Sequence, residues 1–115
     1  MVKQAPCPCT SASARFDQFR LWRSLDWDTT EGRYADVNVQ QCIHCDRLWL
    51  RYAVEYEAFS KSGRWARGVI PEESAKTMLP EEAVAFLAAL PSHLYGGSWF
   101  NGESGERTGP MNWGI

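Results

Sequence analysis

The chain has 115 residues, 44% of them hydrophobic and 13% aromatic, and its net charge at pH 7 is −2. These values exclude an intrinsically disordered body and suit one globular domain over residues 1–115. The small net charge and the isoelectric point near 5.6 give no general attraction to nucleic acid.

The first part of the chain contains one clear strand and one ambiguous segment. We expect residues 1–6 to be a flexible N-terminus. Residues 15–25 fit a helix, because their aromatic side chains follow a helical spacing, but some of them also alternate as in a strand. Residues 26–33 have the composition of a turn. Residues 34–41 alternate between apolar and polar side chains, which predicts a strand.

The middle of the chain predicts a hairpin. Residues 46–59 alternate as a strand does, although their apolar side chains could also gather on one side of a helix. The turn composition of residues 60–64 and the strand-like residues 65–70 favour the strand. We therefore expect two strands joined by a turn.

Residues 71–91 are the clearest helical region, and we expect a helix at about 80–90. Pro80 suits its first turn, Glu81 and Glu82 suit the positive end of the helix dipole, and Pro91 ends it. A short strand is expected over 95–100 and a loop-like tail over 105–115. The predicted fold class is α+β, with an antiparallel β meander of hairpins and one helix packed on the sheet.

Four cysteines form a Cys-x-Cys pair, Cys7 and Cys9, and a Cys-x-x-Cys pair, Cys42 and Cys45. The N-terminal residues lack the apolar core of a signal peptide, and no apolar run approaches the roughly 20 residues that span a bilayer. We therefore expect a cytoplasmic protein without a membrane partner, whose thiols stay reduced. Two close pairs in that compartment predict four ligands of a structural Zn²⁺ ion, with iron or a disulfide as alternatives.

Residues 7–50 are expected to form, in order, a cysteine-bearing turn (a zinc knuckle), a hairpin, a strand that enters a second knuckle and a strand that leaves it. This order resembles the zinc-ribbon class, over less than half of the chain. The resemblance implies that Cys7, Cys9, Cys42 and Cys45 are the metal ligands and that the sheet is built on a zinc-ribbon-like site. The chain departs from the class in a first knuckle one residue short and in Asp46, which stands where many knuckles have glycine.

Catalysis is not expected. A metal held by four cysteines has no open position for water or substrate, and the sequence lacks the usual zinc-protease, phosphate-loop and nucleophile motifs. His44 lies between Cys42 and Cys45, and this CIHC segment would suit a thiol–disulfide redox protein if it began a helix. His93 is expected just after the predicted helix, where its charge would favour the helix dipole.

The leading functional hypothesis is a non-catalytic, zinc-stabilised protein of bacterial type that binds another protein, such as an immunity or antitoxin-type inhibitor. Residues 68–115 carry two Lys and Arg against six Asp and Glu, which suits a basic target. The alternative partner is nucleic acid, bound by a zinc ribbon whose arginines alternate with aromatic rings. The residues of that surface would be Arg15, Arg20, Arg23, Arg47 and Arg51, with Phe16, Phe19 and Trp22.

Overall fold

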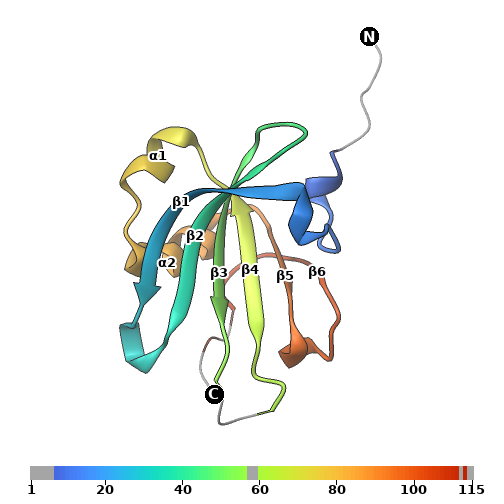
Figure 1. Cartoon of the computed structure of the whole chain (residues 1–115). Helices are drawn as coiled ribbons and strands as arrows, with labels where there is room; N and C mark the ends of the chain where they lie inside the picture. Colours follow the sequence, from blue (N-terminus) through green and yellow to red (C-terminus); the bar gives the residue numbers. More distant parts are fainter. Residues whose placement is uncertain (1–6, 57–59, 112, 114–115) are drawn as a thin grey trace.

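Six antiparallel strands form one sheet, in which each strand pairs with its neighbours in sequence (Figure 1). The structure is a computed structural model that describes residues 7–56, 60–111 and 113. The strands are β1 (Phe19–Asp28), β2 (Ala35–Cys42), β3 (Leu48–Val54), β4 (Arg64–Val69), β5 (His93–Gly96) and β6 (Gly105–Arg107). This arrangement confirms the predicted α+β class and the antiparallel meander.

The three central strands have one apolar face because their sequences alternate in register. Val37 pairs with Tyr52 and Val39 with Leu50 across β2 and β3, so their side chains project to the same side. These residues are fully buried. We call this side the helix face, because it carries the main hydrophobic core and is covered by the helices.

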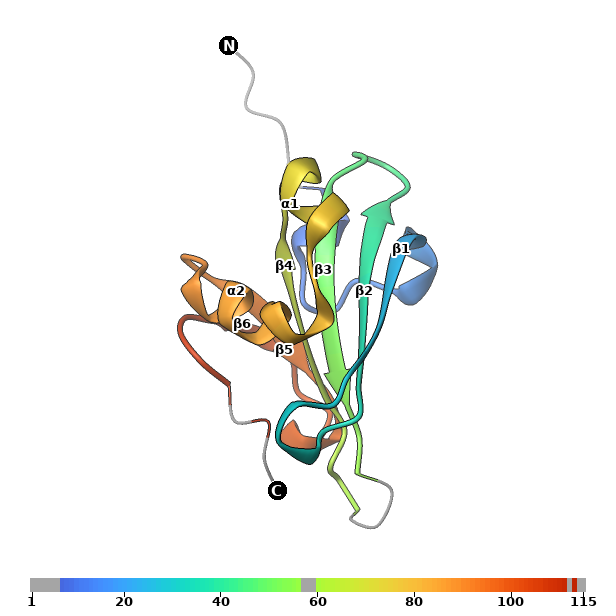
Figure 2. The same cartoon turned by 90° about the vertical axis from the view of Figure 1, so that its left-hand side faces the viewer.

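Two short helices cover the helix face (Figure 2). Helix α1 spans Glu72–Thr77, and α2 spans Ala83–Ala89 after a 3-10 turn over Pro80–Glu82. The helical region predicted over 71–91 is therefore interrupted. Leu79 adopts extended backbone, as expected before proline, and its N–H donates to the Glu82 carboxylate at 2.8 Å. The predicted helix at about 80–90 is thus the 3-10 turn followed by α2.

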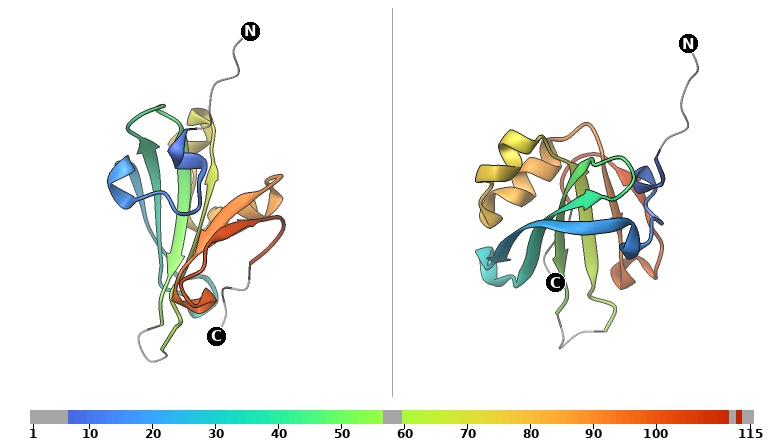
Figure 3. Two further views of the ribbon diagram at one scale, coloured as in Figure 1. Left: turned by 90° about the vertical axis from the view of Figure 1, so that its right-hand side faces the viewer. Right: turned by 45° about the horizontal axis from the view of Figure 1, so that its top comes forward.

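Strand β1 resolves the ambiguity over residues 15–25. A 3-10 turn over Phe16–Gln18 leads directly into the strand, so most of this segment is extended. The pairing of β1 with β2 shifts twice, and Asp26 within it has a φ of 66°. Such irregularities increase strand twist, and β1 runs obliquely to the central strands (Figure 3). The turn predicted over 26–33 consequently begins late, because β1 continues to Asp28.

A buried polar network closes the far end of β1 onto β3. The Tyr52 hydroxyl donates to the Asp28 carboxylate, which also accepts from the backbone N–H of Thr30 at 3.0 Å. Arg33 donates through Nε to the Tyr52 oxygen at 2.9 Å and forms an ion pair with Asp28 at 3.5 Å. Burial alone would raise the pKa of Asp28, but these donors and the arginine lower it below its usual value. The ring of Trp113 packs edge-on against Tyr52.

The C-terminal part differs from its prediction in three places. The strand expected over 95–100 is β5, which ends at Gly96, because Gly97 has a φ of 122° and leaves the sheet. The tail expected to be loop-like begins with strand β6. His93 does not follow the helix as a dipole partner but lies buried within β5.

Some expectations fall on residues that the structure does not describe. The flexible N-terminus predicted over 1–6, the end of the strand predicted over 46–59, and residues 112 and 114–115 of the tail lie outside the described residues. Across the described part of the chain, no helix has the length and apolar character needed to cross a membrane.

Candidate metal centre

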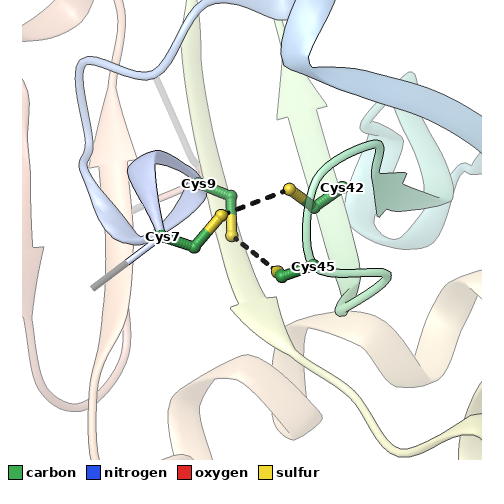
Figure 4. A group of neighbouring side chains, drawn as sticks. All are labelled: Cys7, Cys9, Cys42 and Cys45. Atoms are coloured by element: carbon green, nitrogen blue, oxygen red, sulfur yellow. Dashed lines mark hydrogen bonds between the residues drawn. The ribbon is translucent and has the colours of Figure 1, made fainter. Parts of the chain in front are cut away.

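The structure brings all four cysteines together from two distant segments (Figure 4). Cys7 and Cys9 lie at a 3-10 turn over Pro8–Thr10, before the sheet begins. Cys42 ends β2, and Cys45 lies in the turn that leads to β3. The predicted ligand set is therefore one spatial cluster.

The distances between the sulfur atoms suit tetrahedral coordination of one ion. The Sγ atoms of Cys7 and Cys42 are 3.5 Å apart, those of Cys9 and Cys45 are 3.6 Å apart, and all four lie within 4.8 Å of one another. Thiolates bound tetrahedrally at about 2.3 Å from a metal would be about 3.8 Å apart. A disulfide needs about 2.05 Å, and all four cysteines are free thiols. The cluster could hold a metal ion.

The first turn is short and locally bonded. Pro8 occupies its first helical position, where the missing N–H costs no hydrogen bond. The backbone N–H and the hydroxyl of Thr10 both donate to the Cys7 carbonyl, at 2.9 and 2.8 Å. These bonds hold Cys7 and Cys9 on the same side of the turn although only one residue separates them.

The second turn is a tight hairpin connection between β2 and β3. The N–H of Cys42 donates to the Arg47 carbonyl at 2.9 Å, and the N–H of Asp46 donates to the Cys42 carbonyl at 3.0 Å. Asp46 has a φ of 62°, in the left-handed region that glycine adopts most easily. Asp46 therefore adopts the conformation that glycine adopts at this position in many zinc knuckles. Its short side chain tolerates this conformation.

The thiols differ in acidity. Burial, followed by the neighbouring thiols of Cys45 and Cys7, raises the pKa of Cys9 to about 12. Burial also acts to raise the pKa of Cys42, but backbone N–H groups at Cys45 and His44 lower it to about 7. The His44 N–H lies 3.4 Å from the Cys42 sulfur. These amides favour the thiolate form, which is the form that binds a metal.

The centre rests on the side of the sheet opposite the helices, which we call the open face. Cys9 and Cys42 form a second apolar cluster there with Trp49 and Leu94. Trp49 lies between the two core residues Leu48 and Leu50 of β3 and therefore projects to the open face. The cysteine cluster thus packs the segment before β1 against the sheet.

Arg67 is a buried part of this surrounding that the sequence analysis missed. Its guanidinium lies over the rings of Phe19, Trp49 and Trp65, at 4.9 to 5.6 Å from their centroids, and donates to the Ser11 carbonyl. Burial and then the neighbouring Arg51 lower the pKa of Arg67 to about 10. A signal was present, because Arg67 follows Trp65 by two residues in the WARGVI strand and therefore shares a face with that ring.

The five arginines of the proposed nucleic-acid surface do not form one patch. Arg15 pairs with Asp17 at 3.4 Å, and Arg20 pairs with Asp46 at 3.1 Å. Both pairs are exposed and lie near the start of β1. Each positive charge there is therefore matched by an adjacent carboxylate.

The other three arginines have separate surroundings. Arg23 donates from Nη1 to two carbonyls at the end of α1, both at 2.9 Å. Arg47 lies beside the metal centre, with Nη1 3.9 Å from the Cys9 sulfur. Arg51 lies on the open face, half-buried. Of the associated rings, Phe16 is 87% exposed, whereas Trp22 packs against the main core.

The CIHC segment does not begin a helix. Cys42 is buried at the end of a strand, Cys45 is exposed, and the chain continues through a turn into β3. His44 is exposed in that turn. The local structure is therefore a hairpin turn rather than the helix start that the redox hypothesis assumed.

Comparisons with models of protein families, with curated proteins and with solved structures found no match for this chain. The centre is consequently interpreted from its own geometry. That geometry shows four clustered thiols able to coordinate one ion.

Proposed function

We propose that Cys7, Cys9, Cys42 and Cys45 hold one structural Zn²⁺ ion, in a non-catalytic cytoplasmic protein that acts by binding another protein. The convergence of four sulfur atoms at near-tetrahedral spacing carries the proposal. Four cysteines are a common structural zinc ligand set, and tetrahedral thiolates also accept iron.

The charge around the centre supports metal loading. Four thiolates around a divalent cation carry a net charge of −2, which a buried site must compensate. Arg47 contacts the Cys9 sulfur directly, and Arg67 interacts with Cys9 electrostatically. Such outer groups stabilise and orient metal ligands.

The ion would act as a cross-link. It would join the turn over Pro8–Thr10 to the β2–β3 turn and so close the second apolar cluster. Zinc binding contributes about 10–16 kcal/mol in small zinc-finger peptides, which is comparable with the whole stability of a domain of this size. All four coordination positions would be occupied by sulfur, so that the ion could not activate water.

A protein partner is favoured by the surface. Several large apolar side chains are exposed, and Trp27 and Tyr34 stand near each other at one end of the sheet. Aromatic residues are enriched among those that dominate binding energy at interfaces. We propose an inhibitor of the immunity or antitoxin type, which needs a rigid complementary surface and no catalytic group.

The metal proposal is tested by measuring zinc per chain in purified protein, with Cys9→Ser and His44→Gln as matched variants. We expect one zinc per chain in the native protein and in His44→Gln, and loss of zinc with a lower denaturation midpoint in Cys9→Ser. Cobalt substitution should give the absorption of a tetrahedral thiolate site. A metal-free native protein that remains fully folded would contradict the proposal.

The protein-binding role is tested against nucleic acid. Salt-sensitive retention on immobilised nucleic acid that is lost in an Arg15→Gln/Arg20→Gln variant would favour the alternative partner. We expect no such retention. Tight association with the product of a neighbouring toxin-like gene is the positive result expected for an inhibitor.

A further inference from the structure

A groove lies on the open face at the end of the sheet away from the cysteines, with a volume of about 880 Å³. Its lining includes Ala53, near the end of β3, whose small side chain fills little of the space. Ala53 pairs with Asp36 on one side and with Trp65 on the other. Grooves of this size commonly accommodate side chains or small ligands.

Aromatic rings border the groove on two sides. Trp65 lies on β4, and Gly96 opposite it leaves room for the indole, since a Cβ atom there would come within 2.6 Å of the ring. Trp27, which pairs with Asp36, borders the groove from β1, and Tyr34 lies beside it. Trp27 and Tyr34 are 57% and 72% exposed, so neither ring is buried in the core.

Two carboxylates face the same space. Asp36 is the direct cross-strand neighbour of Ala53, and Glu55, just beyond the end of β3, lines the same groove two residues after Ala53. Diagonal neighbours of this kind are about 7–8 Å apart, close enough to contact one cation between them. Neither carboxylate has an ion pair or a hydrogen bond to another residue in the described part of the chain.

Two arginines, Arg51 and Arg64, also line the groove, but both are more buried than the two carboxylates. Arg51 is half-buried on β3 and interacts electrostatically with Asp36, which acts to raise the pKa of Arg51 against the lowering by burial, although no ion pair within 4 Å joins them. Arg64 contributes to the wall, but its guanidinium lies 3.9 Å from the Trp99 ring centroid and contacts the Trp113 carbonyl in the main core. The exposed charged groups beside Ala53 and the aromatic rings are therefore two carboxylates, of which Arg51 partly compensates Asp36.

We propose that this groove binds a lysine or arginine side chain that a partner protein presents to it. The proposal deepens the protein-binding role proposed above and rests on it. The aromatic rings would attract the cation through their π faces, and Asp36 and Glu55 would accept its hydrogen bonds. Arg51, at the other side of Ala53, would repel the cation and direct it toward Glu55. Exposed rings beside two exposed carboxylates match a basic group better than an acidic one.

The test uses three end-capped tripeptides as probes, Gly-Arg-Gly, Gly-Lys-Gly and Gly-Glu-Gly, titrated into ¹⁵N-labelled zinc-loaded protein at low salt. We expect the arginine and lysine probes to shift the amide signals of residues around Ala53 and the indole signal of Trp27. The glutamate probe should leave these signals unchanged. Zinc per chain is measured on the same samples, so that loss of the metal centre is recognised separately from failure of the groove.

A pair of matched double variants separates the groove from general charge. Asp36→Asn/Glu55→Gln removes both carboxylates of the groove, whereas Glu81→Gln/Glu103→Gln removes two exposed carboxylates elsewhere. We expect the first variant to weaken binding of the arginine probe by about five- to tenfold and the second to leave it within about twofold.

Three results would overturn the proposal. The two double variants could weaken binding equally, the shifts could spread over the whole surface, or the glutamate probe could bind at Arg51 instead. A further variant, Trp27→Ala, should weaken both basic probes about threefold, because one exposed ring contributes modestly. A protein that carries zinc but binds neither basic probe would refute the groove and leave the metal proposal standing.

Discussion

Replacing Tyr52 with phenylalanine tests the buried network that joins β1 to β3. The change removes one hydroxyl and almost no volume. That hydroxyl donates to the carboxylate of Asp28, which is only 1% exposed, and accepts from Arg33 at 2.9 Å. Hydrogen bonds to charged groups contribute about 1.5–3 kcal/mol each, and the ion pair between Arg33 and Asp28 would remain. We expect the free energy of unfolding to fall by about 2–3 kcal/mol.

The assay is urea denaturation of zinc-loaded protein at pH 7, followed by tryptophan fluorescence. For a slope of about 1–3 kcal/mol per molar urea, a loss of that size should lower the midpoint by about 0.7–3 M. Tyr34→Phe provides the control, because the Tyr34 side chain is largely exposed and no hydrogen bond of its hydroxyl is found among the described residues. We expect the control to change the free energy by less than about 0.5 kcal/mol.

The pH dependence adds an independent check. The pKa of Asp28 is lower in the folded protein than its usual value, so its contribution is present above that usual value and is lost as the pH falls through the folded pKa. Without the Tyr52 hydroxyl the folded pKa of Asp28 should rise. The stability difference between the two proteins should therefore shrink in acid. An equal effect of Tyr52→Phe and Tyr34→Phe at pH 7 would refute this account of the network.

Three further predictions concern single positions. Gly97→Ala should lower the free energy of unfolding by more than about 3 kcal/mol, seen as a lower melting temperature. At this position φ is 122°, and a Cβ atom would lie 2.4 Å from the Gly63 carbonyl oxygen. Asp46→Ala should cost about 1–2 kcal/mol in urea denaturation, whereas Asp46→Gly should cost less, because φ is 62°. Burial and then Arg107 lower the pKa of His93 in the fold, so stability should fall as pH drops below about 6.5. Urea midpoints between pH 7.5 and 5.5 should show this fall, and His93→Gln should flatten it.

The local predictions that succeeded rest on strict patterns. Residues 35–40 alternate strictly between apolar and polar side chains, and the structure forms β2 over Ala35–Cys42 with the expected apolar face. The return strand after the 60–64 turn is β4. These segments were predictable because each can bury only one face, and a shift of one residue would expose the whole apolar set.

The predictions that stayed open or failed depend on contacts between distant segments. Residues 15–25 carried signals for both helix and strand, and pairing with β2 decides for the strand. The helical region over 71–91 was interrupted where Leu79 adopts extended backbone before Pro80. His93 was placed after the helix because nothing local showed that it pairs within the sheet, opposite Arg107.

The amino-acid sequence alone determined the four thiols, their grouping in two close pairs and the alternating strands that separate them. Those are local properties, since they follow from residue type and spacing along the chain. The tertiary structure decided that both pairs meet on one face of the sheet, that Arg67 lies among three rings beside them, and that Asp36, Ala53 and Trp65 share a groove. These relations join residues far apart in the chain. Strand register brings the groove residues together, whereas packing of the N-terminal turn against the sheet brings the two cysteine pairs together.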